Sequence, residues 1–164
     1  MKTSTIRTIL ITLVLGALIA LVYLAAVDTA RAKGYEGVSV KHALSHVRSA
    51  KAALADAERV LTATRRYSAA YGASVGRWVW LSDQVGWPAA QWPTLFMVVS
   101  RESGGFPGIM NSQGSGAAGL LQFLAPAYQG QWGYPAFPPL NPRTNLKAGV
   151  WFWRHSGWQP WAVQ

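Results

Sequence analysis

The longest apolar run in the chain lies near its N-terminus. Residues 8–27 carry almost only apolar side chains, and the basic residues Lys2 and Arg7 precede them. About 20 apolar residues are enough to span a bilayer, and a basic flank before such a run is typical of a targeting sequence. The Ala-Arg-Ala triplet at residues 30–32 matches a signal-peptidase cleavage pattern. We therefore expect residues 1–33 to form a transmembrane signal anchor, with a cleaved signal peptide as the alternative.

A helical pattern with interspersed charges follows this run. Between Val38 and Ala70, apolar residues approximate a spacing of three and four positions: Val40, Leu44, Val47, Leu54, Ala57 and Leu61. Such spacing predicts one long helix. Its apolar stripe is narrow and rich in alanine, so packing on the rest of the chain and self-association as a short coiled coil both remain open. We interpret residues 34–71 as a basic, alanine-rich stalk.

The remaining chain alternates short helical segments with turn-rich stretches. Apolar residues at helical spacing predict three helices, over residues 74–84, 94–103 and 142–156. Asn141 precedes the last helix as an N-cap, and glycines follow the second and third helices as stop signals. Residues 108–119 are rich in glycine and polar side chains, which predicts an irregular loop. We therefore expect residues 72–164 to form a mainly α domain in which this loop frames a cleft.

Composition narrows the choice of chemistry. A chain of 164 residues is long enough for one modest domain with accessory segments. It contains no cysteine, which excludes disulfides and thiolate metal sites. His42 and His46 are spaced as i and i+4, but no third ligand is nearby, so we expect them on a solvated helix face. We expect neither a metal nor another cofactor.

The positive charge is unevenly distributed along the chain. The formal net charge is +9, yet only four basic residues lie in the second half: Arg101, Arg143, Lys147 and Arg154. A basic N-terminal half suits an anionic lipid surface or an acidic polymer. We expect no nucleic acid partner, because the aromatic residues are not interleaved with these charges as a base-stacking surface requires.

One carboxylate stands out in the C-terminal half. Glu102 is the only acidic residue after Asp83, and it lies on the apolar face at the end of the helix predicted over residues 94–103. Partial burial and the negative end of a helix both disfavour an ionised carboxylate, which suits a proton donor. Arg101 points about 100° away around the helix, so we do not count it as a partner. We interpret Glu102 as a general acid, the alternative being an ordinary solvated glutamate.

All nine tryptophans lie between Trp78 and Trp161. Such a density in a small domain without disulfides supplies core volume, and it also suits the walls of a sugar-binding groove. Both interpretations stay open.

Five short motifs follow one another in the C-terminal half. They are Glu102-Ser103-Gly104-Gly105, Asn111, and residues 116–123, 145–149 and 157–161. In this order and spacing they resemble the lysozyme-like lytic transglycosylases, between the soluble lytic transglycosylase domain and the resuscitation-promoting factor domain. The resemblance covers about residues 92–161 and implies a small, lysozyme-like α-helical catalytic domain.

The resemblance also implies a reaction and the residues that perform it. The β-1,4 bond between N-acetylmuramic acid and N-acetylglucosamine in peptidoglycan would be cleaved. Glu102 would protonate the glycosidic oxygen and then take the proton of the muramic acid 6-hydroxyl, which closes a 1,6-anhydro ring. Ser103 would orient Glu102, while the groups that bind sugar or brace the cleft would be Asn111, Gln122 and Asn145.

Two departures from the family patterns are visible. Soluble lytic transglycosylases usually have Pro and then Thr soon after the glutamine, whereas Pro126 comes one place late here and no Thr follows. Resuscitation-promoting factors usually have a Cys just before the Glu and another at the end of the domain. Arg101 and Gln164 stand at those places in this chain, which is consistent with a missing disulfide.

The resemblance indicates a bacterial or phage protein of the cell envelope, with peptidoglycan glycan strands as its partner. Its catalytic domain would lie outside the cytoplasm, either anchored to the membrane by the N-terminal helix or secreted. A second possibility is a hydrolase, a lysozyme or endolysin, with water as the acceptor. The second carboxylate that ordinary glycoside hydrolases use is absent after Asp83, although Asp83 itself could fold back. A third is a non-catalytic wall-binding or scaffold protein, in which the helix over residues 38–70 engages an envelope partner.

Overall fold

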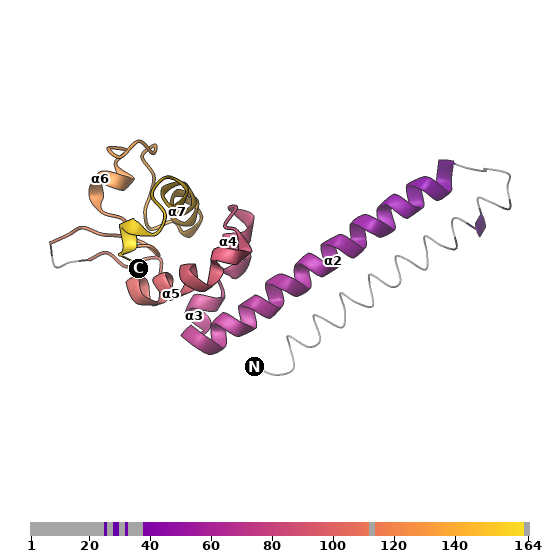
Figure 1. The fold of residues 1–164 in the computed structure, drawn as a ribbon, viewed down its shortest axis with the longest axis horizontal. Coiled ribbons are helices and arrows are strands. Elements are labelled where there is room, and N and C mark those ends of the chain that lie inside the picture. The colour runs from indigo at the N-terminus through magenta and orange to yellow at the C-terminus, as the bar shows by residue number, and fades with distance from the viewer. Residues whose placement is uncertain (1–24, 26–27, 30–31, 33–37, 112–113, 163–164) are drawn as a thin grey trace. The chain divides into compact units, whose positions relative to one another are not determined.

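Helices dominate the part of the chain that a computed structural model describes, namely residues 25, 28, 29, 32, 38–111 and 114–162. Their order along the chain (Figure 1) is α2 (Val38–Tyr71), α3 (Ala73–Gly76), α4 (Val79–Gln84), the 3-10 helix η1 (Ala89–Gln91), α5 (Trp92–Ser103), α6 (Ala125–Tyr128), α7 (Pro142–Ser156) and the 3-10 helix η2 (Gln159–Trp161). No β-strand forms among these residues, so the mainly α prediction is confirmed. The chain divides into two units, Met1–Glu58 and Arg59–Gln164.

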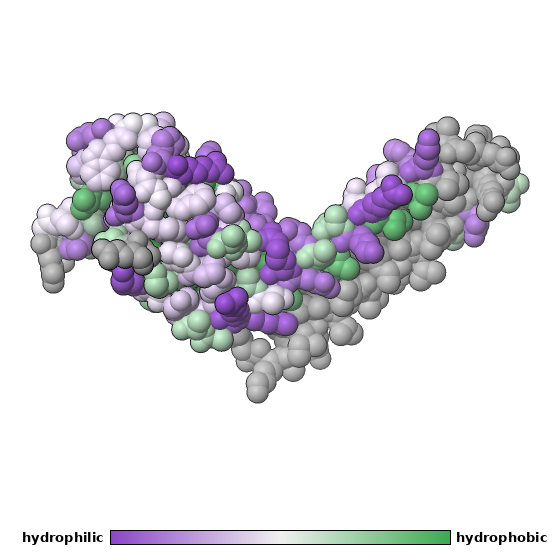
Figure 2. All heavy atoms as spheres, in the orientation of Figure 1, coloured by the Kyte–Doolittle hydropathy of each residue, from purple (hydrophilic) through white to green (hydrophobic). Residues whose placement is uncertain are grey.

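The first unit contains the N-terminal part of α2. The long helix predicted over residues 38–70 is confirmed, since α2 runs from Val38 to Tyr71. Within the first unit Leu44, Val47 and Leu54 are exposed, and Figure 2 shows apolar and hydrophilic residues next to one another along this helix. Self-association or an envelope partner through this helix stays a prediction.

The predicted transmembrane helix requires a correction. The apolar run over residues 8–27 lies outside the described residues, except for residue 25. Within the part of the chain that the structure describes, no helix is both long and apolar enough to cross a membrane. The one long helix, α2, carries charged side chains along its length, including Lys41, Arg48 and Lys51. Charged side chains are costly in hydrocarbon, so α2 does not qualify as a membrane span. Since no described helix qualifies, we withdraw the transmembrane and signal-anchor prediction.

The second unit is built around α5. The side chains of α5 that are fully buried are Leu95, Phe96, Val98 and Val99. They recur at helical spacing, so that one face of the helix enters the core. Trp87, which follows α4, is buried as well and donates its Nε1 hydrogen to the carbonyl oxygen of Leu146 in α7 at 3.0 Å.

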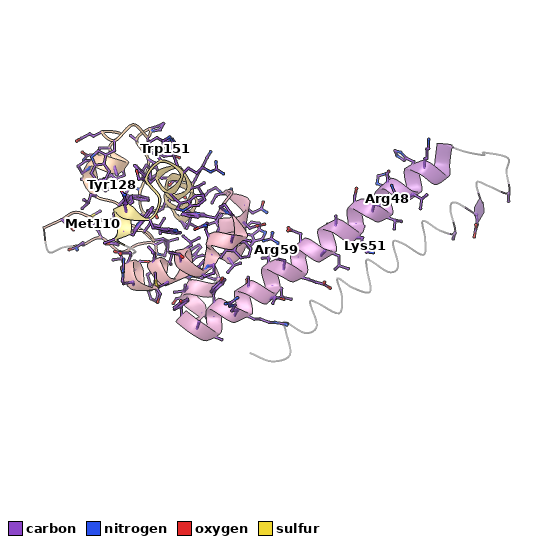
Figure 3. All side chains as sticks on the ribbon, in the orientation of Figure 1. Arg48, Lys51, Arg59, Met110, Tyr128 and Trp151 are labelled. Atoms are coloured by element: carbon purple, nitrogen blue, oxygen red, sulfur yellow. The ribbon has the colours of Figure 1, made fainter. Side chains whose placement is uncertain are left out.

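The last turns of α2 belong to this second unit. Tyr67 is buried, with its ring centroid 4.6 Å from that of Phe96 on α5. Arg59 (Figure 3) donates to Asp83 of α4 at 2.8 Å, and its guanidinium lies 4.8 Å from the ring centroid of Trp92. The unit therefore begins at Arg59, within the helix that the sequence analysis assigned as a whole to a stalk.

The loop between α5 and α6 folds back on itself. Isolated antiparallel bridges pair Met110 with Ala118 and Ala118 with Phe123, so three short stretches lie side by side. Gly119 between them has φ of 82°, and a side chain there would collide with the carbonyl oxygen of Pro139. The predicted irregular loop is thus packed closely against the segment that leads into α7.

Candidate active site

Glu102 lies at the end of the buried face of α5. Leu95, Val98 and Val99 on the same face are fully buried, whereas 26% of the Glu102 side chain is exposed. The helix ends one residue later, because Gly104 adopts the left-handed conformation that terminates helices, with φ of 59°. The carboxylate is therefore partly shielded from water and still accessible from solvent.

Arg101 is a direct partner of Glu102, contrary to the expectation from sequence. Its Nε and Nη2 atoms lie 3.3 and 3.1 Å from Oε1 of Glu102. The two Cα–Cβ directions do differ by about 100° around the helix. The long arginine stem nevertheless folds back across the helix end, since Nη2 also donates to the carbonyl oxygen of Trp161.

Ser103 braces the end of α5. Among the described residues, its hydroxyl forms no hydrogen bond with the Glu102 carboxylate. Its buried Oγ donates to the carbonyl oxygen of Val99 at 3.1 Å and accepts the N–H of Gly105 at 3.2 Å. Any orientation of Glu102 by Ser103 acts through the backbone. That role stays a prediction.

Residues before α4 hold the turn that follows Glu102. Ser74 Oγ donates to the carbonyl oxygen of Gly104 at 2.8 Å. The carbonyl oxygen of Gly105 accepts hydrogen bonds from Trp78 Nε1 at 2.8 Å and from Arg77 Nη2 at 3.1 Å. Sequence reasoning missed these three side chains, because no local pattern predicts contacts between residues that lie so far apart in the chain.

Asn145 supports the loop of residues 116–123 from α7. This side chain is fully buried, and its Oδ1 accepts the N–H of Leu121 at 3.0 Å. Its Nδ2 donates to the carbonyl oxygens of Pro139 and Ala118 at 2.8 and 3.3 Å. Because both amide hydrogens are engaged with the backbone, the geometry favours bracing over sugar binding.

Gln122 supports the same loop from within. Its backbone is left-handed, with φ of 47°, and its Nε2 donates to the carbonyl oxygens of Gly119 at 2.8 Å and Ile109 at 3.2 Å. The side chain is half-buried, so its remaining acceptor oxygen is the group that would contact a ligand.

Asn111 lies in the exposed part of the loop. Its backbone N–H donates to the carbonyl oxygen of Ala117 at 2.7 Å, which places it beside the bridge of Met110 and Ala118. Large apolar side chains close to it in sequence, Phe106 and Ile109, are exposed. The exposed position of Asn111 is compatible with contact to a glycan, and sugar binding by Asn111 stays a prediction.

Trp161 connects the helix end of Glu102 with this loop. Its carbonyl oxygen accepts from Arg101, and its buried indole donates from Nε1 to the carbonyl oxygen of Leu121 at 3.0 Å. The N–H of Leu121 is bonded to Asn145 in turn. One hydrogen-bonded network thus joins Glu102 to Asn145 and to the loop that carries Gln122.

Asp83 is held by an ion pair of its own. It is the only acidic side chain of the second unit besides Glu102, and Arg59 Nη2 lies 2.8 Å from its Oδ1. A two-carboxylate glycosidase places its carboxyl groups about 5–9.5 Å apart, with both available for reaction. Asp83 is therefore the one carboxylate that a two-carboxylate mechanism in this unit would have to use beside Glu102.

Most of the tryptophan side chains contribute to the core. Trp87, Trp92 and Trp161 are buried, and each Nε1 donates to a backbone carbonyl oxygen. Trp80 and Trp132 are exposed. Core volume therefore accounts for much of the tryptophan content.

Metal-binding clusters are absent from the part of the chain that the structure describes, in which no three His, Asp or Glu side chains gather closely enough to hold an ion. The rings of His42 and His46 on α2 form a T-shaped contact, with centroids 4.8 Å apart.

Comparison with protein-family models, with curated proteins and with solved structures found no match to this chain. The resemblance to lytic transglycosylases rests on the motif residues and stays a prediction.

Proposed function

We propose that the second unit is a lysozyme-like catalytic domain that cleaves peptidoglycan glycan strands as a lytic transglycosylase. The observation that carries the proposal is the setting of Glu102. It is a single, partly exposed carboxylate at the end of a buried helix face, joined through Arg101 and Trp161 to the loop of residues 116–123. These are the segments on which the family resemblance depends.

One carboxyl group is sufficient for the proposed reaction. Glu102 donates its proton to the glycosidic oxygen while the bond from that oxygen to C1 of N-acetylmuramic acid breaks. The 6-hydroxyl oxygen of the same sugar forms a bond to C1, and its proton passes to Glu102. The acid is thereby regenerated, and the product carries a 1,6-anhydro ring without any use of water.

The charge of the second unit is consistent with an acidic polymer as the substrate. The unit has eight basic and two acidic side chains, a net charge of +6, and both acidic side chains are paired with arginine. Such a surface attracts anionic partners, and the attraction weakens with salt. We propose that the protein acts on the cell wall outside the cytoplasm, in a bacterium or from a phage.

Hydrolysis is the second candidate, with water as the acceptor. It would require another carboxylate or a comparable group to activate water. Asp83 is the only other acidic side chain of the unit, so this candidate makes Asp83 the second reacting group. A non-catalytic wall-binding or scaffold protein is the third candidate, which the basic charge alone would also suit.

The reaction products distinguish these candidates. Purified sacculi are incubated with the full-length chain, and the released muropeptides are analysed by mass spectrometry. A transglycosylase releases fragments with 1,6-anhydromuramic ends, whereas a hydrolase releases reducing ends. Binding to sacculi without any release would contradict both enzymatic proposals and support the wall-binding protein.

A further inference from the structure

We infer that Arg101 is a positioning residue for Glu102, which fixes one carboxyl oxygen and leaves the other for proton transfer. The inference rests on the proposed function, because it assigns Glu102 the role of acid and base. It concerns a residue that neither the motifs nor the sequence analysis identified as functional.

The contacts of the carboxylate are one-sided. Both Arg101 donors, Nε and Nη2, point at Oε1 of Glu102, at 3.3 and 3.1 Å. Among the described residues no side chain or backbone group donates to Oε2. Arg101 thus anchors Oε1, and Oε2 is the oxygen that faces a substrate and carries the transferred proton.

The anchor is itself connected to the core. Arg101 Nη2 donates to the carbonyl oxygen of Trp161, whose buried ring lies 5.7 Å from that of Phe123 and 5.5 Å from that of Trp158. The guanidinium is half exposed, and exposed ion pairs contribute little to stability. We therefore infer that Arg101, held between Glu102 and the carbonyl oxygen of Trp161, mainly orients the Glu102 carboxylate.

A single-acid mechanism depends on the orientation of the Glu102 carboxyl group. The same oxygen must first reach the glycosidic oxygen and later the 6-hydroxyl group of the same sugar. A carboxylate fixed at one oxygen meets both groups with less loss of conformational freedom. The guanidinium also stabilises the negative charge that appears on the carboxylate once the proton has left.

The test compares three substitutions in the full-length chain. Arg101→Met removes every donor and keeps an unbranched stem, while Arg101→Lys keeps the charge. Arg65→Met is the matched control, since Arg65 is an exposed arginine on α2, outside the loop and the helix end that carry the candidate site. Turnover of soluble glycan strands gives kcat and KM, and circular dichroism verifies folding.

We expect Arg101→Met to lower kcat by about 10- to 100-fold, as a misplaced catalytic group does, with KM changed less than about twofold. Arg101→Lys should recover part of kcat, and Arg65→Met should leave kcat unchanged. An unchanged kcat in folded Arg101→Met, or a rise in KM alone, would overturn the positioning role.

Hydrogen exchange provides a readout that does not depend on activity. Arg101→Met should accelerate exchange of the amides of Trp161 and Ala162, which close η2, whereas Arg65→Met should not. Unchanged exchange would contradict the link between Arg101 and the C-terminal segment. A wild-type chain that releases no product would overturn the proposed function and the positioning role of Arg101. Faster exchange in Arg101→Met would then show that the contact is structural only.

Discussion

Gly105 determines the direction in which the chain leaves the candidate acid. Its φ of 80° lies in the left-handed region, and a side chain there would collide with the backbone carbonyl group of Ser74. The carbonyl oxygen of Gly105 is held by Trp78 and Arg77. Since only glycine satisfies both the dihedral angle and the close approach, this position fixes the end of α5 against the segment before α4.

Gly105→Ala should therefore destabilise the protein by about 2–4 kcal/mol, because the methyl group meets backbone atoms that cannot move easily. Urea unfolding followed by circular dichroism measures the loss. Gly108→Ala is the control, since a side chain at Gly108 would meet no atom within 4 Å. Equal unfolding midpoints for the two variants would contradict the close packing of this turn.

At the residue scale, the sequence predicts Glu102 as the candidate acid, which stays a prediction, but it does not predict the ion pair of Glu102 with Arg101. An isolated carboxylate on an apolar helix face is visible in the order of the residues alone. The direction of the Arg101 side chain is not, because it depends on the carbonyl oxygen of Trp161, 60 positions away. The sequence likewise does not distinguish sugar binding from bracing for Gln122 and Asn145, because that distinction depends on their backbone partners.

At the element scale, helices with local boundary signals were predictable. Asn141 Oδ1 accepts the N–H groups of Arg143 and Thr144, at 3.0 and 3.2 Å, as an N-cap should. The helix predicted over residues 74–84 instead divides into α3 and α4. The division accompanies a tertiary contact, since Gly76 packs directly against Ser68 of α2. The spacing of apolar residues in the sequence does not predict that contact.

The cap of α7 gives a prediction at this scale. Asn141→Ala should lower the free energy of unfolding by about 1 kcal/mol, because two N–H groups at the start of α7 lose their acceptor. Asn141→Asp keeps an acceptor oxygen and should remain close to the wild type. Thermal unfolding of both variants checks this, and a loss of equal size in the two would contradict a capping role.

At the scale of the whole molecule, the second unit depends on the end of α2. Tyr67 lies in the last turns of α2 and packs on Phe96, and burial raises the pKa of the Tyr67 hydroxyl above its usual value, with a smaller opposing effect of Arg66. Burial also raises the pKa of Tyr134. Both groups are therefore more easily ionised in the unfolded chain than in the folded one.

This difference predicts a loss of stability at alkaline pH. The contribution of the neutral tyrosines is fully present below the ordinary tyrosine pKa of about 10 and is lost as pH rises through the higher value in the folded state. Urea midpoints measured from about pH 9 to pH 11 should fall in the wild type and fall less steeply in Tyr67→Phe. Identical slopes would show that Tyr67 ionises equally in both states.

The central claim is that one carboxylate performs the chemistry, and a matched pair of substitutions tests it most directly. Glu102→Gln and Asp83→Asn remove the same charge from the two acidic side chains of the second unit. Each variant is incubated as the full-length chain with purified sacculi, and muropeptides with 1,6-anhydromuramic ends are quantified by mass spectrometry. We predict at least about a thousandfold loss in Glu102→Gln, as expected when an essential acid is removed. Folded Asp83→Asn should still release these products. Loss of product release in Asp83→Asn, or persistent release in Glu102→Gln, would contradict the single-acid mechanism.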